Sequence, residues 1–271
     1  MSSPPVVFFS VDGLRPDAIL QADTPTMHKM MESGSHCLTA RTTMPSITLP
    51  CHTSMLRGVD MPRHGITSNT FHPLSRPVPS LIDAAHSGGK RTGFFFNWAE
   101  LRDLYEPASL DVAFSWNDPH TLESDLLVAS EAIRYLKKKP FDLLFVYLGH
   151  VDECGHRAGW MSERYLNAAA NADKCIGNVL SAYEEIGLEP IALVLSDHGG
   201  HGQSHGTDMM EDITIPWILS GPGVRTGPLA EGSVRIFDTC PTLASQLGIP
   251  LAREWEGRVV EEAFTSLSSS A

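Results

Sequence analysis

The stretch Ile191-Ala192-Leu193-Val194-Leu195-Ser196-Asp197-His198-Gly199 is an apolar run that ends abruptly in polar residues. Two other segments have the same form: Val6–Val11 precedes Asp12, and Phe141–Leu148 precedes the segment that contains Asp152. Near-continuous apolar runs of this length are typical of strands in a parallel sheet, where both faces are covered. These three segments therefore predict the central strands of such a sheet.

Helical patterns alternate with these runs and complete the prediction of the fold. The helical segments are Met27–Ser33, Leu122–Lys139, Ser162–Ile186 and Thr239–Leu247. Weaker candidates for strands are Thr92–Phe96 and Ile215–Leu219. Strands that alternate with helices indicate an α/β fold with a doubly wound, mostly parallel sheet and helices on both faces. Because no Pro/Gly linker divides the chain, we expect one catalytic domain over residues 1–271, with a frayed Ser-rich tail at 266–271.

Composition narrows the classes of function. The chain has 271 residues, with 20 Lys and Arg against 32 Asp and Glu and a net charge of −12. This balance argues against a protein that coats nucleic-acid phosphates with basic residues. Five cysteines without a CxxC pair predict neither a disulfide framework nor a zinc knuckle. No apolar run approaches the roughly 20 residues of a membrane helix, so the sequence favours a cytoplasmic protein without a membrane partner.

Carboxylates and imidazoles follow each of the three strong strand candidates. Asp12, Asp152 and Asp197 fall at strand ends, where open parallel sheets bind their ligands. Nearby histidines add nitrogen donors at His156, His198, His201 and His205. Mixed N/O donors of this kind indicate a site for two divalent metal ions. The alternative for any single residue is that the Asp caps a helix and the His is a solvated loop residue.

The segment Met44–His52 contains a second candidate site. Pro50 suits the first turn of a helix that Gly58 would end. Thr48 would then lie near the helix N-terminus, where backbone N–H groups favour an anion. A hydroxyl in that position can serve as a nucleophile if a metal lowers its pKa. The alternative is that Thr48 is only a helix cap.

The order of these motifs resembles the alkaline phosphatase superfamily, and within it the nucleotide pyrophosphatase/phosphodiesterase family. The resemblance extends from Val6 to about Leu251. It rests on six segments in order: Asp12-Gly13-Leu14-Arg15, Pro45–His52, His64–Asn69, Asp152-x-x-Gly155-His156, Asp197-His198-Gly199 and His205-Gly206-Thr207-Asp208. Each segment is a weak pattern alone, but the six in this order are specific.

The resemblance implies a two-metal hydrolase that acts on phosphodiester or pyrophosphate bonds of a small phosphorylated substrate. One ion would be held by Asp12, Asp197, His198 and the Thr48 hydroxyl, and the other by Asp152, His156 and His205. The metal is usually zinc in this family, with manganese as an alternative. Thr48 falls on the nucleophile, and Asn69 on the residue that binds a phosphoryl oxygen. His205 is preferred to His201 because it has the His-Gly-Thr-Asp context.

Other activities remain open from the sequence. A phosphonate C–P hydrolase of the phosphonoacetate hydrolase type and a phosphomonoesterase have the same architecture, and a non-catalytic binding protein is a more distant alternative. No lysine falls in the motifs, and Arg15 and Arg41 are the obvious cations near them. Because Asn69 is neutral, the sequence favours a singly charged diester over a dianionic monoester. Most aromatic residues between Asn69 and Leu122 suit the core, and one or two suit a substrate groove.

Overall fold

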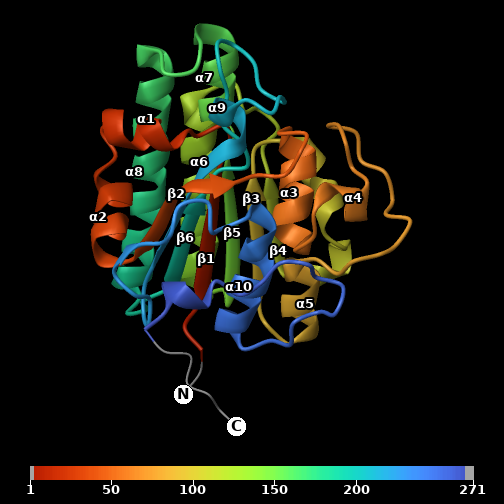
Figure 1. Ribbon diagram of the computed structural model, residues 1–271. Coiled ribbons are helices and arrows are strands. Elements are labelled where there is room, and N and C mark those ends of the chain that lie inside the picture. Colours follow the sequence, from red (N-terminus) through yellow and green to blue (C-terminus); the bar gives the residue numbers. More distant parts are fainter. Residues whose placement is uncertain (1–2, 266–271) are drawn as a thin grey trace.

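The computed structural model describes residues 3–265, which form an eight-stranded sheet flanked by helices (Figure 1). The strand order is β4-β3-β5-β1-β6-β7-β2-β8. The strands are β1 Val6–Val11, β2 Ser35–Arg41, β3 Thr92–Phe96, β4 Val112–Ser115, β5 Leu143–Leu148, β6 Ile191–Leu195, β7 Thr214–Ser220 and β8 Gly227–Pro228. Of these strands only β7 runs against the others, so the predicted mostly parallel sheet is confirmed. The predicted frayed tail at 266–271 lies outside the described residues.

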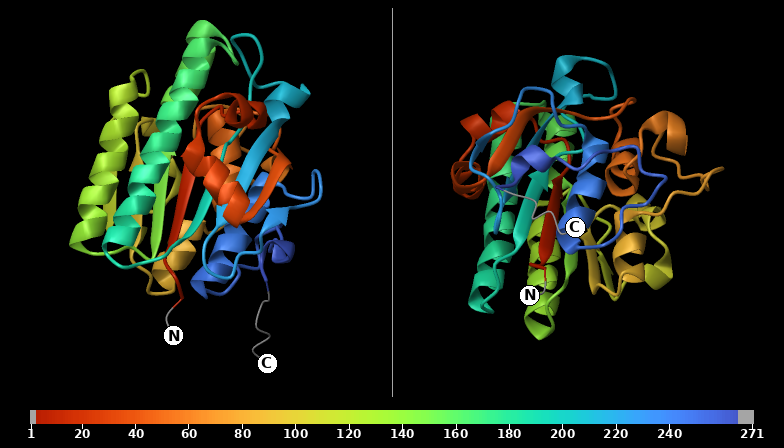
Figure 2. Two further views of the ribbon diagram at one scale, coloured as in Figure 1. Left: turned by 90° about the vertical axis from the view of Figure 1, so that its left-hand side faces the viewer. Right: turned by 60° about the horizontal axis from the view of Figure 1, so that its bottom comes forward.

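Helices cover both faces of the sheet (Figures 1 and 2). The helices α3, α5 and α10 pack on one face, and α1, α2, α6, α7 and α8 pack on the other. Their bounds, with those of the short α4 and α9, are α1 Pro16–Gln21, α2 Pro25–Ser33, α3 Thr48–Arg57, α4 Met61–His64, α5 Leu81–Ser87, α6 Leu122–Lys138, α7 His150–Ala158, α8 Glu163–Glu185, α9 Met210–Ile213 and α10 Thr239–Leu247. Among the residues that the structure describes, no helix combines the length and apolar character that a bilayer crossing requires.

The two faces of β1 explain why the strand is apolar at nearly every position. Val6 and Phe8 contribute to the core beneath α3 and α10, whereas Val7, Phe9 and Val11 contribute to the core beneath α6 and α8. Successive side chains of a strand point to opposite faces, so a sheet that is covered twice needs apolar residues at both sets of positions. The doubly wound fold predicted from the apolar runs follows from this packing.

The central strands end at the same level of the sheet. β1 lies between β5 and β6, and Val11 pairs with Leu148 while Ser10 pairs with Leu195. The loops that follow these three strands therefore emerge side by side. This register brings the polar residues after each strand to one edge, which is where open parallel sheets bind ligands.

The structure also contains elements that the sequence did not predict. β2 and β4 were not predicted, because β2 mixes polar with apolar residues and β4 is a half-exposed edge strand. β5 begins at Leu143 rather than at Phe141. α3 begins at Thr48, so Pro50 is still within its first turn, as expected. These differences leave the predicted positions of the strand-end loops unchanged.

Candidate active site

Three buried carboxylates meet at the ends of β1, β5 and β6. Asp12 follows β1, Asp197 follows β6, and Asp152 lies in the first turn of α7. Asp12 is 2% exposed, Asp197 is 0% exposed and Asp152 is 9% exposed. The backbone N–H of Gly13 donates to Asp197 Oδ1 at 3.1 Å, which ties the loop after β1 to the loop after β6. The sheet thus gathers three acidic residues that are far apart in the chain.

His198 joins two of these carboxylates in a group that could hold a cation. Its Nε2 lies 3.3 Å from Asp12 Oδ1 and 3.3 Å from Asp197 Oδ2. The ligand atoms of the three residues all lie within 4.8 Å of one another. The Nδ1 of His198 donates to the carbonyl of Gly199 at 2.8 Å, which leaves the lone pair on Nε2 to face the carboxylates.

A second group forms around Asp152. The ligand atoms of Asp152, His198 and His205 also lie within 4.8 Å of one another. His205 Nε2 is 3.8 Å from Asp152 Oδ1, and His156 Nε2 is 3.3 Å from Asp152 Oδ2. The rings of His198 and His205 stack with their centroids 3.8 Å apart. The structure brings His156 and His205 to Asp152 as expected, but it also brings His198, which the sequence had assigned to the other group alone.

The carboxylates have the features of metal ligands. Asp12 Oδ1, Asp152 Oδ1 and Asp197 Oδ2 are buried and have no hydrogen-bond partner. Burial and the nearby charges of Asp197 and Asp152 raise the pKa of Asp12 well above its usual value. Burial likewise raises the pKa of Asp197. Buried carboxylates this close are costly unless a cation compensates them, so the donor set fits divalent ions with mixed oxygen and nitrogen ligands.

Thr48 is the first residue of α3 and faces this cluster. Its Oγ1 lies 3.2 Å from His198 Nε2, and the residue is 4% exposed. The preceding Ile47 is extended and supplies no side-chain cap, and the N–H of Leu49 is accepted by Asn69 instead, so the N–H of Thr48 is the one that α3 leaves without such a cap. The N-terminus of a helix favours an anion through such an N–H group and its dipole. The hydroxyl therefore lies between a metal-ligand cluster and an anion-binding helix end.

Asn69 completes the same cavity. Its Oδ1 accepts a hydrogen bond from the backbone N–H of Leu49 at 3.0 Å, which fixes the side chain beside the start of α3. The cavity has a volume of about 170 Å³ and is lined by Asp12, Thr48, Asn69, Trp98, Pro119, Tyr147, Gly149, Asp152, Glu153, His156 and His205. Most of the predicted site residues thus line one small polar cavity, with Asp197 and His198 buried behind it.

His52 supports Thr48 from beneath. Its Nδ1 bonds the carbonyl of Thr48 at 2.8 Å, and its Nε2 bonds Ser10 Oγ at 2.8 Å. Because a carbonyl only accepts, Nδ1 carries the proton and Nε2 accepts from the Ser10 hydroxyl. Burial lowers the pKa of His52, which agrees with this neutral form. The sequence assigned His52 no ligand role, and these contacts give it a supporting position.

The loop after β6 holds His201 and His205, the two candidates for one metal-ligand position, in different environments. His201 Nδ1 bonds Asp212 Oδ1 at 2.7 Å and does not line the cavity. His205 Nδ1 bonds the carbonyl of Ser46 at 2.8 Å, which turns its Nε2 towards Asp152. The loop therefore brings His205 into the cluster, whereas His201 holds the loop against α9.

Tyr147, Trp98 and Glu153 are among the cavity residues that were not predicted to belong to the site. The hydroxyl of Tyr147 donates to Asp12 Oδ2, and Trp98 and Glu153 line the cavity mouth. Tyr147 lies within the predicted strand, and a strand pattern alone does not tell which side chain reaches a site. Trp98 was one of several aromatics expected to be mainly core. Its position in the loop that begins at the end of β3 is the signal that points to the site.

Arg15 and Arg41, the two cationic residues that the sequence places near the motifs, form contacts outside the cavity. Arg15 pairs with Asp17 and donates to the carbonyl of Gly200 at 3.0 Å, and Arg41 donates to the hydroxyl of Thr214. No Lys or Arg is among the residues that line the cavity. At its rim, Glu153 pairs with His120 at 2.7 Å and lies 3.8 Å from Arg157. Asn69 is therefore a neutral donor in a cavity that is lined by three carboxylates and two histidines but by no Lys or Arg.

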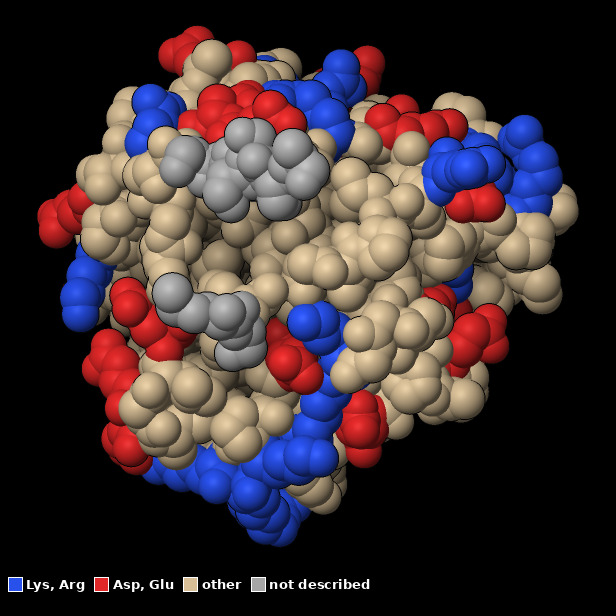
Figure 3. All heavy atoms as spheres, turned by 90° about the horizontal axis from the view of Figure 1, so that it is seen from below, with Lys and Arg blue, Asp and Glu red and all other residues tan. Residues whose placement is uncertain are grey.

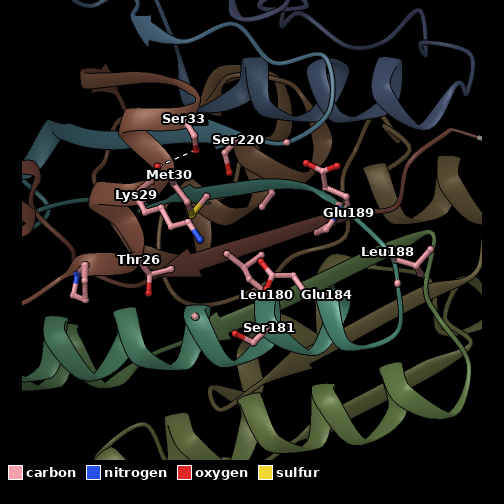
Figure 4. Close-up of a pocket in the computed structure, with 16 residues that line it drawn as sticks. Thr26, Lys29, Met30, Ser33, Leu180, Ser181, Glu184, Leu188, Glu189 and Ser220 are labelled. Atoms are coloured by element: carbon pink, nitrogen blue, oxygen red, sulfur yellow. Dashed lines mark hydrogen bonds between the residues drawn. The ribbon is translucent and has the colours of Figure 1, made fainter.

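Other surfaces and cavities lie away from this cluster. A cavity of about 760 Å³ lies between α2, α8 and the adjoining strands, where Lys29 and Glu184 face it from the two helices (Figure 4). None of the candidate site residues lines it. On the face that carries both termini, acidic and basic side chains share the surface (Figure 3). The small cavity at the strand ends is thus where the predicted site residues converge.

Comparison with known proteins gives the family of the chain. The family model described as type I phosphodiesterase / nucleotide pyrophosphatase matches residues 6–86 and 79–213. Ectonucleotide pyrophosphatase/phosphodiesterase family member 1 of Mus musculus is 23% identical over 259 residues, which cover 83% of this chain and 28% of that protein. The chain therefore spans little more than a quarter of that relative's length.

Solved structures share the fold. A murine ectonucleotide pyrophosphatase/phosphodiesterase 5 structure superposes with a TM-score of 0.77 at 16% identity, covering 92% of this chain and 96% of that one. A phosphonate monoester hydrolase of Agrobacterium radiobacter superposes with a TM-score of 0.75 at 16% identity, covering 96% of this chain and 77% of that one. The chain shares with these structures a doubly wound, alkaline phosphatase-like fold. Because the family model matches most of the sequence, the chain belongs to the type I phosphodiesterase / nucleotide pyrophosphatase family.

Proposed function

We propose that this chain, as a single catalytic domain, is a metal-dependent hydrolase that cleaves phosphodiester or pyrophosphate bonds with Thr48 as the nucleophile. The observation that carries the proposal is the Thr48 hydroxyl, which lies at a helix N-terminus and 3.2 Å from His198 Nε2. Three buried carboxylates with unpartnered oxygens surround that position. The related murine structure is described as an inactive threonine-to-alanine variant in complex with AMP, which supports a threonine in this role.

The donor set suggests how two divalent cations would be held. Asp12, Asp197 and His198 would hold one cation beside the Thr48 hydroxyl. The other would be held by Asp152, His156 and His205. Mixed carboxylate and imidazole donors suit zinc, with manganese as the alternative. When bound, such cations lower the pKa of a nearby hydroxyl and offset the negative charge of the phosphoryl group.

The chain's own residues would then perform the displacement. The Thr48 oxygen forms a bond to phosphorus, its proton passes to solvent, and the bond between phosphorus and the leaving oxygen breaks. The side-chain amide of Asn69 and the backbone N–H of Thr48 hold the non-bridging oxygens. The leaving oxygen takes up a proton from water. Hydrolysis of the phosphothreonine by a second water restores the Thr48 hydroxyl and releases the product.

The substrate class follows from the charges around the cavity. A dianionic monoester needs more positive charge at its non-bridging oxygens than a monoanionic diester does. The lining residues include no Lys or Arg, and Glu153 adds a further carboxylate at the rim. Trp98 offers an apolar surface for the organic group of a diester. These features favour a diester or the α-phosphoryl group of a nucleotide.

A substrate panel on the purified protein tests this proposal. The panel compares bis-p-nitrophenyl phosphate, the p-nitrophenyl ester of thymidine 5′-monophosphate, p-nitrophenyl phosphate and phosphonoacetate, each with the Thr48→Ala variant as the control for background hydrolysis. We expect the two diesters to be the best substrates. Preference for p-nitrophenyl phosphate would indicate a phosphomonoesterase instead, and rapid phosphate release from phosphonoacetate would indicate a C–P hydrolase.

A further inference from the structure

The helix α7 has no side-chain cap of its own. Its N-cap residue is Gly149, which has no side chain to accept hydrogen bonds from the first N–H groups of the helix. Two residues from other elements accept them instead. Asn97 Oδ1 accepts from the N–H of Gly149 at 3.1 Å, and Asp125 Oδ1 accepts from the N–H of His150 at a longer 3.4 Å.

These two residues are locked to each other in the core. Asn97 directly follows β3, and Asp125 lies near the start of α6. Asn97 Nδ2 donates to Asp125 Oδ1 at 2.7 Å and to Ser124 Oγ at 2.9 Å. Asn97 and Asp125 are both 0% exposed. Both polar atoms of the Asn97 side chain are therefore used, and its amide cannot rotate without breaking a buried hydrogen bond.

The helix that this pair caps holds two of the predicted metal ligands. Asp152 is in the first turn of α7, and His156 is in the last. The helix also lies very close to the loop after β1, because a Cβ on Gly13 would come within 3.0 Å of the Asp152 backbone. Metal ligands tolerate displacements of only about 0.2 Å. A small shift of α7 would therefore move Asp152 and His156 away from His205.

We propose that Asn97 and Asp125 are positioning residues, which cap α7 from two other elements and thereby set Asp152 and His156 for cation binding. This inference rests on the proposed metal-dependent function, and it concerns two residues outside all six segments that carry the family resemblance. Both act through Asp152, because neither of them lines the cavity.

The chemistry of Asp125 determines which substitutions are informative. Burial raises the pKa of Asp125 to about 7, and its Oδ2 has no hydrogen-bond partner. An asparagine at this position keeps the accepting oxygen without a buried charge, so Asp125→Asn should be mild. Asn97→Asp replaces a donor with a carboxylate that faces Asp125, which should repel it above that pKa. Exchanging the two residues restores one amide and one carboxyl group.

The fold provides a matched control for the substitutions of Asn97 and Asp125. Asp173 on α8 caps α2 in the same manner, because its carboxylate accepts from the N–H of Thr26 at 3.0 Å and of Met27 at 2.7 Å. Asp173 is 1% exposed and does not line the candidate site. Asp173→Ala therefore removes an equivalent cap from a helix that supplies none of the predicted ligands.

The experiment compares Asn97→Asp, Asp125→Asn, the double exchange and Asp173→Ala with the wild-type chain at about pH 8. Zn²⁺ titration gives the affinity and number of bound ions, and amide hydrogen exchange follows Gly149 and His150. We expect Asn97→Asp to weaken one Zn²⁺ site by about tenfold or more and to speed exchange at both amides. The double variant Asn97→Asp/Asp125→Asn should restore the Zn²⁺ affinity and the hydrogen-exchange rates of the two amides. Asp173→Ala should change neither of these measurements.

Each outcome separates this inference from the proposed function. Loss of rescue in the double exchange, or equal loss of Zn²⁺ affinity in Asp173→Ala, would overturn the inference. If Asn97→Asp does not fold, a folded double exchange with wild-type Zn²⁺ affinity is the rescue, and an unfolded one contradicts it. If the wild-type chain binds neither Zn²⁺ nor Mn²⁺, the proposed function fails, while the hydrogen-exchange rates of the Gly149 and His150 amides still decide whether the pair caps α7.

Discussion

The hydroxyl of Thr48 lies 3.2 Å from Nε2 of His198, although 150 residues separate the two in the chain. One residue begins a helix and the other follows a central strand. The candidate nucleophile and the candidate metal ligand His198 therefore come from different elements of the fold, which meet at this contact. Thr48 can therefore be substituted while all the Asp and His residues that are candidate metal ligands stay in place.

Removal of the Thr48 hydroxyl should abolish turnover without unfolding the chain. We expect Thr48→Ala to lower kcat on a diester by several orders of magnitude, because the covalent route is lost. Thr48→Ser should retain part of the activity, since it keeps an oxygen at the same place. The measurement is steady-state hydrolysis with metal content and circular dichroism as controls. Near-wild-type turnover by Thr48→Ala would contradict the assignment.

The two loop histidines should differ in their effect on metal content. We expect His205→Ala to lower the number of divalent ions bound, because its Nε2 faces Asp152. His201→Ala should leave that number unchanged, since its ring bonds Asp212 instead. Metal analysis of protein prepared without chelator measures both, and chelation should stop turnover. The reverse pattern would assign the ligand role to His201.

A matched pair of substrates tests the absence of cations around the cavity. We expect kcat/KM for a diester to exceed that for its matched monoester by at least about tenfold, a difference of roughly 1.4 kcal/mol in transition-state binding. The physical reason is the neutral Asn69 in a cavity whose lining residues include no Lys or Arg. Introducing a cation with Asn69→Lys should narrow the ratio. An equal or inverted preference in the wild-type chain would show that the charge argument is wrong.

The burial of His64 predicts that the chain loses stability at low pH, through a residue that is not one of the candidate metal ligands. His64 is 4% exposed, its Nδ1 accepts from the N–H of Ile66, and its Nε2 lies 3.0 Å from Ser54 Oγ. Burial lowers the pKa of His64 from 6.5 to about 4, with the charge of Asp60 opposing the shift. Below the unfolded-state pKa, the unfolded chain takes up a proton that the folded chain does not.

The stabilising effect of a neutral His64 is therefore fully present above its unfolded pKa and disappears as the pH falls towards the folded value. We expect the free energy of unfolding of the wild type to fall by about 3 kcal/mol more than that of His64→Asn between about pH 7 and pH 4. Asparagine keeps the acceptor for Ile66 and does not titrate. Urea unfolding across this range gives the difference, and parallel curves for the two proteins would exclude the effect.

The sequence predicted the fold well where the physical signal is local. Strands buried on both faces need an apolar residue at nearly every position, so Val6–Val11 and Ile191–Leu195 were evident. β2 was not predicted, because Ser35–Arg41 mixes polar with apolar side chains. The direction of β7 was not predicted either. Periodicity reports which residues are buried, and the direction of a strand depends on the connection before it.

The candidate site was predicted in part for the same reason. Asp12 and Asp197 follow evident strands, so their proximity could be expected from the sheet alone. The sharing of His198 between two groups, and the hydrogen bond from Tyr147 to Asp12, depend on side-chain orientation that no spacing specifies. The roles of these residues in catalysis, and the cytoplasmic location of the chain, stay predictions.

The single free lone pair of His198 has a consequence for how metal would enter the site. Its Nδ1 is committed to the Gly199 carbonyl, so one atom, Nε2, serves both ligand groups. An imidazole nitrogen donates to one ion at a time. The two groups therefore compete for it, and the ion that does not receive it is held by the remaining donors of its own group. We expect stepwise loading, in which a tight first equivalent precedes a weaker second one, so that at one equivalent of metal most chains hold one ion and few hold two or none.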